Sequence, residues 1–128
     1  MIIFGKMGNE ERDEMLEKFR KGIISVIITT NMLARGIDVP EVQIVINFDV
    51  PLTSDGKGGI TGDPENYLHR IGRTGRFGTE GLALTIYDRD VDEQYLNQIL
   101  DHYSMREKCK LLEGPEQLTE LLKKIRDM

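Results

Sequence analysis

Three arginines and a histidine lie close together in the segment YLHRIGRTGR, residues 67–76. Arg70, Arg73 and Arg76 are evenly spaced, and a glycine directly precedes each of the last two. A helix that needed only solubility would avoid glycine, which costs about 1 kcal/mol relative to alanine at a helix position. Guanidinium groups bind planar anions such as phosphate or carboxylate through paired N–H donors. The pattern therefore favours an anion site, and the alternative is a basic helix end that complements the helix dipole.

A second polar segment, TTNMLARGIDVP at residues 29–40, directly follows a predicted strand. Gly36 would let the backbone approach a ligand closely, while Thr30 offers a hydroxyl and Asp38 a carboxylate. By residue chemistry alone the segment fits equally well a short helical connector in which Arg35 and Asp38 pair on the surface.

Other candidate sites fail at a required position. The GKMG segment has Met7 where a P-loop needs serine or threonine. The aspartates around residue 90 have the spacing of a calcium loop, but Glu93 replaces its obligatory glycine.

His69 has no serine or cysteine near it in sequence, so its chemistry favours a structural hydrogen bond. Cys109 stands alone in an apolar segment and is predicted to be inert core, and we expect no metal site.

Length and composition indicate one ordinary globular domain. The chain has 128 residues, of which 39% are hydrophobic and 30% charged. No apolar run approaches the ~20 residues of a membrane span, so no membrane partner is expected. A single cysteine excludes an internal disulfide and favours a reducing, cytoplasmic or nuclear setting. The net charge of −5 argues against a dedicated nucleic-acid binder, so any such contact must come from a local positive patch.

Short β-branched and apolar runs predict the strands. They lie at residues 2–4, 23–28, 42–48 and 81–87, with a last short run at 108–112. The runs at 23–28 and 42–48 are continuous, as expected of strands buried on both faces of a parallel sheet. The segment at 51–64 is rich in glycine and polar residues and is predicted to be a loop.

Cap residues and apolar stripes predict four helices. The first begins at the N-cap Asn9 and ends at Gly22, and the second begins at Asp63 and carries the arginines. A third covers 90–103, with Val91, Tyr95, Ile99 and Tyr103 on one face. A fourth starts at Pro115, and Leu118, Leu121, Leu122 and Ile125 form its core stripe.

This alternation of strands and helices predicts an α/β layered domain with a mostly parallel β-sheet flanked by helices. Ligands of such sheets bind beyond the carboxyl ends of the strands. We expect both polar segments to lie at that edge.

The octet HRIGRTGR, preceded by TTNMLARGIDVP and VINFDVP in that order, resembles the second RecA-like domain of DEAD-box ATP-dependent RNA helicases. The resemblance covers nearly the whole chain and implies a RecA-like fold for residues 1–128. Within the family, the segments NFDVP and YLHRIGRTGRFG look most like those of the helicases that release messenger RNA at the nuclear pore.

The resemblance implies the nucleotide-binding residues. Arg73 and Arg76 match the catalytic arginine fingers that reach the γ-phosphate of ATP held by the other domain. Asp38 matches the residue that bonds the ribose of the same nucleotide, and Gly36 is assigned to the nucleotide with it. The family binds ATP with Mg²⁺, which its first domain holds.

The resemblance also implies the RNA contacts. Thr30, Arg35 and Gly36 match positions that touch the RNA backbone or bridge the two domains. A neighbouring motif supplies three further RNA-binding positions, which are Gly5, Asn9 and Arg12. The last two matched residues, His69 and Arg70, belong to positions that couple the RNA and ATP sites across the cleft.

Several motifs of the family are missing from this chain. The glutamine motif, the Walker-type loop, the Asp-Glu-Ala-Asp tetrad and the Ser-Ala-Thr motif all belong to the first domain. The opening strand and helix of the second domain also have no match, so we expect a fragment that is inactive alone. Its expected partners are the first RecA-like domain, the RNA backbone in a sequence-independent manner and nuclear-pore export activators, and an uncovered sheet predicts self-association.

Two alternatives share these sequence features. A helicase of the translation-initiation branch carries the same octet, and a non-catalytic RNA- or protein-binding scaffold would use the isolated lobe. An upstream P-loop domain in the parent gene distinguishes the enzyme from the scaffold.

Overall fold

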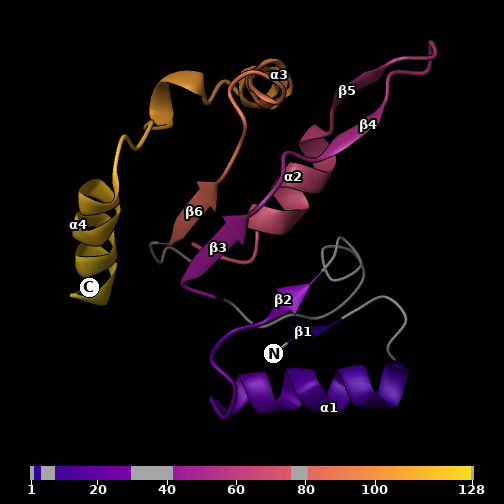
Figure 1. Ribbon diagram of the computed structural model, residues 1–128. Helices are drawn as coiled ribbons and strands as arrows, with labels where there is room; N and C mark the ends of the chain where they lie inside the picture. Colours follow the sequence, from indigo (N-terminus) through magenta and orange to yellow (C-terminus); the bar gives the residue numbers. More distant parts are fainter. Residues whose placement is uncertain (1, 4–7, 30–41, 76–80, 128) are drawn as a thin grey trace. The chain divides into compact units, whose positions relative to one another are not determined.

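The computed structural model describes residues 2–3, 8–29, 42–75 and 81–127 (Figure 1). The chain divides into two compact units, residues 1–40 and 41–128. The first unit contains β1 (Ile2–Ile3), α1 (Asn9–Arg20) and β2 (Ile28–Thr29). Strands β1 and β2 are parallel, with Ile2 opposite Ile28.

Helix α1 begins one residue earlier than the sequence predicts. Gly8 is the N-cap, with φ −62° and ψ 153°, and Asn9 is already helical. The Asn9 side chain is not a cap, because its carbonyl oxygen accepts a hydrogen bond from the Arg12 guanidinium. The predicted end is confirmed, since Lys21 caps the helix and Gly22 follows with φ +74°. Leu16 is the buried residue of its apolar face.

The prediction of a buried strand over residues 23–28 is wrong for most of its length. Strand β2 includes only the last residue of that run, and Ile23, Val26 and Ile28 are 69%, 61% and 54% exposed. The N–H groups of Ile23 and Ile24 donate to the carbonyl of Lys18 at 2.9 and 3.3 Å. The first two residues of the run therefore complete the end of α1, so they cannot take part in a strand ladder.

The second unit is built on the parallel pair β3 (Ile44–Asn47) and β6 (Leu82–Thr85). Ile44 lies opposite Leu82 and Asn47 opposite Thr85. The two strands lie within the runs predicted at 42–48 and 81–87. Helix α2 (Pro64–Ile71) packs against β3 of this pair. Its predicted start is confirmed, because Asp63 Oδ1 accepts the N–H of Asn66 at 3.1 Å and Pro64 occupies the first turn.

The predicted loop at 51–64 contains a β-hairpin instead. Strands β4 (Leu52–Ser54) and β5 (Ile60–Gly62) pair antiparallel. Gly56 and Gly58 turn the chain with φ of +78° and +84°. Asp55 Oδ1 accepts the N–H groups of Lys57 at 2.7 Å and Gly59 at 3.0 Å, and these bonds lower the pKa of Asp55. The glycine and polar residues that predicted an irregular loop therefore form the turn of a hairpin.

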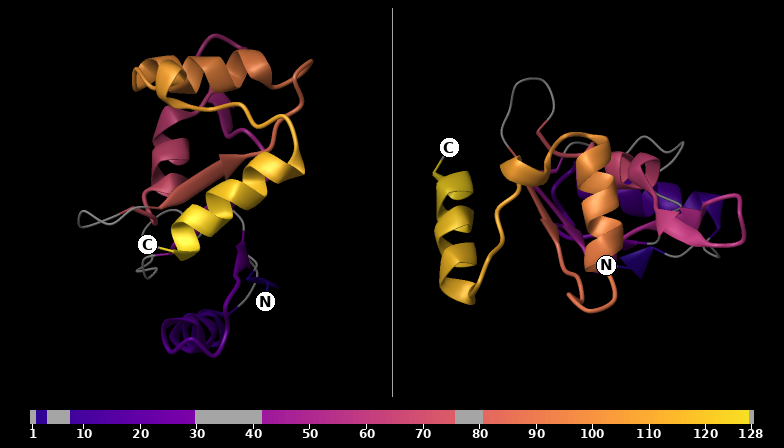
Figure 2. Two further views of the ribbon diagram at one scale, coloured as in Figure 1. Left: turned by 90° about the vertical axis from the view of Figure 1, so that its left-hand side faces the viewer. Right: turned by 90° about the horizontal axis from the view of Figure 1, so that it is seen from above.

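The core of the second unit gathers around α3 (Glu93–His102). Ile99 is fully buried, and it clusters with Val50, Tyr67, Leu96 and Leu100. Helix α3 packs against both β5 and α2 (Figures 1 and 2).

Only part of the apolar stripe predicted for the third helix is correct. Ile99 forms the centre of the core, and Tyr95 and Tyr103 pack against its edge. Val91 is 58% exposed, because the helix begins only at Glu93 and Val91 lies in the preceding turn.

The predicted strand at 108–112 is absent from the described residues. The 3₁₀ helix η2 (Arg106–Lys108) ends at the first residue of that run, and residues 109–112 have no regular secondary structure. The N–H groups of Lys108 and Cys109 both donate to the carbonyl of Met105. Cys109 is exposed, so its assignment to the core is also wrong. Helix α4 (Pro115–Arg126) follows an extended segment, as Figures 1 and 2 show, and confirms the predicted start at Pro115.

Along α4, Leu118 and Leu121 are half-buried and Leu122 is 37% exposed. None of the helices in the described ranges has both the length and the apolar character that crossing a bilayer requires.

Candidate functional site

Arg73 lies in a tight turn at the end of α2. The Gly72 N–H donates to the carbonyl of Leu68 at 2.8 Å, and the Thr74 N–H donates to that of Ile71 at 3.1 Å. A Cβ atom at Gly72 would stand 2.8 Å from the Leu68 carbonyl oxygen, so this turn requires glycine. Gly75 has φ +70°, a left-handed backbone conformation that favours glycine.

Two hydrogen bonds join this turn to the residues directly before β3, and a third joins those residues to β6. The Val42 N–H donates to the Arg73 carbonyl at 2.8 Å. The Thr74 hydroxyl donates to the Gln43 carbonyl at 2.9 Å, and the Leu82 N–H donates to the same oxygen at 2.9 Å. The backbone that carries Arg73 is therefore bonded to the residues before β3, and the Gln43 carbonyl links them in turn to β6.

The turn lies at the amino end of β3, so the expectation of the carboxyl edge is wrong for Arg73. Helix α2 starts beside the carboxyl end of β3, where the Asp63 N–H donates to the Pro51 carbonyl at 2.9 Å. It then runs back along the sheet and ends beside residues 42 and 43 (Figure 1). One helix length therefore separates the two edges of the sheet.

Arg70 contacts the opposite edge from Arg73. Its Nη1 atom donates to Asp49 Oδ1 at 2.9 Å and to the Asp49 backbone carbonyl at 3.1 Å. The Arg70 side chain is only 12% exposed, whereas that of Asp49 is 76% exposed. Asp49 was given no role in the sequence analysis, although it lies inside the NFDVP motif that supported the resemblance.

His69 is a surface residue one turn after Glu65. Its Nε2 atom lies 3.6 Å from Glu65 Oε1, and the two side chains are 44% and 73% exposed. An exposed pair at this spacing stabilises the helix by only about 0.3–0.5 kcal/mol.

In the first unit, the structure brings together two of the predicted RNA-binding residues. Asn9 and Arg12 lie on the first turn of α1, and their side chains are hydrogen-bonded. The remaining candidates lie outside the described residues; they are Gly5, Thr30, Arg35, Gly36, Asp38 and Arg76.

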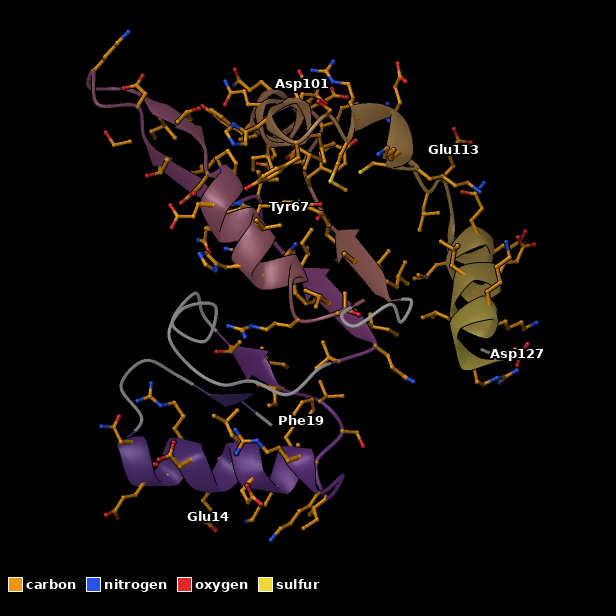
Figure 3. The ribbon with its side chains drawn as sticks, turned by 180° about the vertical axis from the view of Figure 1, so that it is seen from behind. Glu14, Phe19, Tyr67, Asp101, Glu113 and Asp127 are labelled. Atoms are coloured by element: carbon orange, nitrogen blue, oxygen red, sulfur yellow. The ribbon has the colours of Figure 1, made fainter. Side chains whose placement is uncertain are left out.

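Tyr67 attaches α2 to the sheet at its buried side (Figure 3). Burial raises the pKa of the Tyr67 hydroxyl, the nearby Cys109 thiol raises it further, and a hydrogen bond with Thr85 lowers it. Thr85 also accepts a hydrogen bond from the buried Asn47 side chain at 3.4 Å. Sequence reasoning missed this polar group, although the alternation of β3 and β6 places Asn47 and Thr85 on one face.

Although Cys109 is exposed as a residue, partial desolvation of its thiol raises the pKa of that group. Within the described ranges, no three acidic, histidine or cysteine side chains gather as a metal site would require.

The arrangement is that of an α/β lobe that presents an arginine from a fixed backbone turn. Such a guanidinium can stabilise negative charge on a phosphate supplied by another domain. The family described as "Helicase conserved C-terminal domain" matches residues 1–78, and the chain belongs to this family. The match spans both TTNMLARGIDVP and HRIGRTGR.

The relatives of this chain are DEAD-box helicases. It is 51% identical over 104 residues to the ATP-dependent RNA helicase dbp5 of Botryotinia fuckeliana, covering 80% of this chain and 22% of that protein. It is 47% identical over 105 residues to human ATP-dependent RNA helicase DDX19A, covering 82% of this chain and 21% of that protein. The chain therefore spans about a fifth of the length of these curated relatives.

Solved structures confirm the predicted RecA-like α/β fold. S. cerevisiae Dbp5 bound to RNA and ADP BeF3 matches with a TM-score of 0.77 and 36% identity, over 97% of this chain and 31% of that one. A variant C-terminal domain of the same protein, bound to a Gle1 variant and IP6, matches with a TM-score of 0.70 and 31% identity, over 100% of this chain and 69% of that one.

Proposed function

We propose that this chain is the C-terminal lobe of a two-lobed ATP-dependent RNA helicase. The observation that carries the proposal is the family match over residues 1–78, which includes the octet HRIGRTGR. Arg73 of this octet lies on a turn that is bonded to the residues before β3. In the intact protein, ATP and RNA binding would close the lobe onto the first RecA-like domain. Closure would then drive separation of short duplexes or remodelling of RNA–protein complexes.

Arg73 and Arg76 would act as catalytic arginine fingers on the γ-phosphate of ATP. Phosphoryl transfer is catalysed largely by stabilising spread negative charge, and such a finger contributes about 10³- to 10⁵-fold, or about 4–7 kcal/mol. Asp38 and Gly36 would contact the rest of the nucleotide. The chemistry of the Arg73 guanidinium fits a phosphate, whereas Mg²⁺ would be held by the first domain.

RNA would bind through its phosphate backbone, without regard to sequence. Asn9 and Arg12 support this role, because they present a hydrogen-bonded amide and guanidinium on the first turn of α1. Gly5, Thr30, Arg35 and Gly36 would complete the RNA contacts. Such binding needs only a local positive patch, so a net charge of −5 is compatible with it.

His69 and Arg70 would couple the two sites. Arg70 supports this role because it joins the last turn of α2 to Asp49, beyond the carboxyl end of β3. Arg73 lies in the turn that directly follows α2. A shift of α2 would therefore be transmitted along its whole length.

The identity to dbp5 and DDX19A favours a role in messenger RNA export over translation initiation. On this basis the protein would work in the nucleus and cytoplasm, at the nuclear pore, with an export activator. The structure of a Dbp5 C-terminal domain bound to Gle1 and IP6 supports an activator contact on this lobe. Copies of the chain would also associate through exposed apolar residues such as Ile23 and Val26.

The test is an RNA-stimulated ATPase assay on the full-length protein. We expect hydrolysis that depends on RNA, and none from the 128-residue chain alone. The isolated chain should bind RNA weakly, near the ~10⁻⁴ M end of non-specific affinity, and more weakly as salt rises. A parent gene without a P-loop domain, or tight salt-insensitive binding by the isolated chain, would contradict the enzyme and favour a scaffold.

A further inference from the structure

We propose that Thr74 and Gly81 are positioning residues that fix the turn carrying Arg73. The inference rests on the proposed function, because it concerns how the arginine is aimed at a phosphate. Neither residue would touch the nucleotide. Both act on the backbone that flanks Arg73.

The Thr74 hydroxyl provides a side-chain link between the turn and the sheet. It donates to the Gln43 carbonyl at 2.9 Å, directly before β3. The Leu82 N–H, the first of β6, donates to the same oxygen at 2.9 Å. One carbonyl therefore holds the arginine turn and both parallel strands together.

Gly81 allows this contact because it has no side chain. A Cβ atom there would lie 1.9 Å from Thr74 Oγ1 and 2.7 Å from the Gly75 backbone nitrogen. Real Cβ atoms essentially never come closer than 3.0 Å to such atoms, so any larger residue would push the turn away. The start of β6 thus packs directly on the arginine turn.

These contacts restrain Arg73 from both sides. Its carbonyl accepts the Val42 N–H at 2.8 Å, and the next residue is held by its N–H bond to Ile71 and by its hydroxyl. Helix ends fray when their groups lack such partners. Because a misplacement of about 1 Å can reduce a rate about 10²-fold, a frayed turn would weaken catalysis without removing the arginine.

The functional test compares Thr74→Val with Thr74→Ser in the full-length protein. Valine keeps the branched shape but removes the hydroxyl, whereas serine keeps the hydroxyl. We expect Thr74→Val to lower kcat for RNA-stimulated ATP hydrolysis by about 10- to 100-fold, with KM for ATP changed less than about twofold. Thr74→Ser should retain most of the wild-type kcat.

Thr119 provides a matched control. Its hydroxyl also donates to a backbone carbonyl at 2.9 Å, that of Pro115 in α4, so Thr119→Val removes the same type of bond elsewhere. We expect that variant to keep wild-type kcat. An unchanged kcat in Thr74→Val, or an equal loss in Thr74→Ser, would overturn the inference.

A second measurement follows the turn in the 128-residue chain, independently of activity. Hydrogen exchange of the Val42 amide should become faster in Thr74→Val and in Gly81→Ala. It should stay unchanged in Gly114→Ala, because a Cβ atom at Gly114 meets nothing within 4 Å. Unchanged exchange in both Thr74→Val and Gly81→Ala would contradict the proposal that these two residues fix the turn. A wild-type full-length protein without ATPase activity would instead reject the proposed function, whatever the exchange shows.

Discussion

The guanidinium of Arg70 and the carboxylate of Asp49 are 2.9 Å apart, and the same Nη1 atom also donates to the Asp49 backbone carbonyl. This pair joins the last turn of α2 to the segment after β3. The partners differ in environment, since the arginine is 12% exposed and the aspartate 76% exposed. Their substitutions should therefore have unequal effects.

Arg70→Ala should lower the free energy of unfolding by about 1–2 kcal/mol, because it removes charge-assisted bonds and a largely buried side chain. Asp49→Ala should lower it by less than about 1 kcal/mol, since the carboxylate is exposed and the backbone carbonyl remains as acceptor. Urea unfolding of both variants measures the two values. A larger loss for Asp49→Ala would show that the carboxylate carries most of the interaction.

Arg73→Ala should reduce RNA-stimulated ATP hydrolysis by the full-length protein at least ~10²-fold, because a finger acts mainly in the transition state. ATP binding, measured by fluorescent-nucleotide titration, should be nearly unchanged. Arg106→Ala is the control, since Arg106 lies on η2 and pairs with Asp101. Near wild-type turnover in Arg73→Ala would reject the finger assignment.

Gly62→Ala should detach the hairpin from α3. A Cβ atom at Gly62 would lie 2.5 Å from the Tyr95 carbonyl oxygen and 2.8 Å from Ile99 Cγ1, at the centre of the core. We expect a loss of about 1–3 kcal/mol in unfolding free energy from overpacking. Gly114→Ala, which meets open space, should change it by less than about 1 kcal/mol. Equal stabilities in thermal melts would mean that the hairpin shifts freely.

Alkaline pH should destabilise the second unit through Tyr67. Burial raises the pKa of this hydroxyl above its usual 10.0, so the folded state retains the proton more strongly than the unfolded state. This contribution to stability is complete below pH 10.0 and is lost as pH rises through the folded-state pKa.

The measurement is the free energy of unfolding across that alkaline range, in wild type and in Tyr67→Phe. The phenylalanine variant should lose stability less steeply as pH rises. Identical slopes in wild type and Tyr67→Phe would remove Tyr67 as the cause.

Local signals predicted the elements that local chemistry determines. Asp63 followed by Pro64 defines the start of α2, and Pro115 that of α4, because cap and proline preferences depend on neighbouring residues only. The prediction that the second helix carries the arginines is correct for Arg70 but not for Arg73, because α2 ends at Ile71.

Features that depend on which partner a backbone group binds were not predicted. The run at 23–28 has strand composition, but its first N–H groups complete α1 through Lys18. The edge of the sheet at which Arg73 lies depends on the direction of α2, which only the bonds to Val42 and Gln43 reveal. The hairpin was recoverable, since Asp55 followed by Gly56 is a turn signal between two short strands.

The 128-residue chain should self-associate through the exposed apolar residues of its first unit. Ile23, Val26 and Ile28 are all more than half exposed, and β2 pairs only with β1 among the described strands. Apolar side chains beside an open strand edge recruit other chains, because association removes them from water and pairs the edge. Light scattering during gel filtration should therefore give a mass above 14.6 kDa that rises with concentration.

Two valines of similar exposure distinguish association through residues 23–28 from non-specific association through any exposed apolar side chain. Val26 is 61% exposed in the first unit and Val91 is 58% exposed in the turn before α3. Val26→Ser should shift the chain toward the monomer, whereas Val91→Ser should leave its association unchanged. A wild-type chain that elutes as a clean monomer at every concentration, or an equal shift in both variants, would show that residues 23–28 do not form the contact.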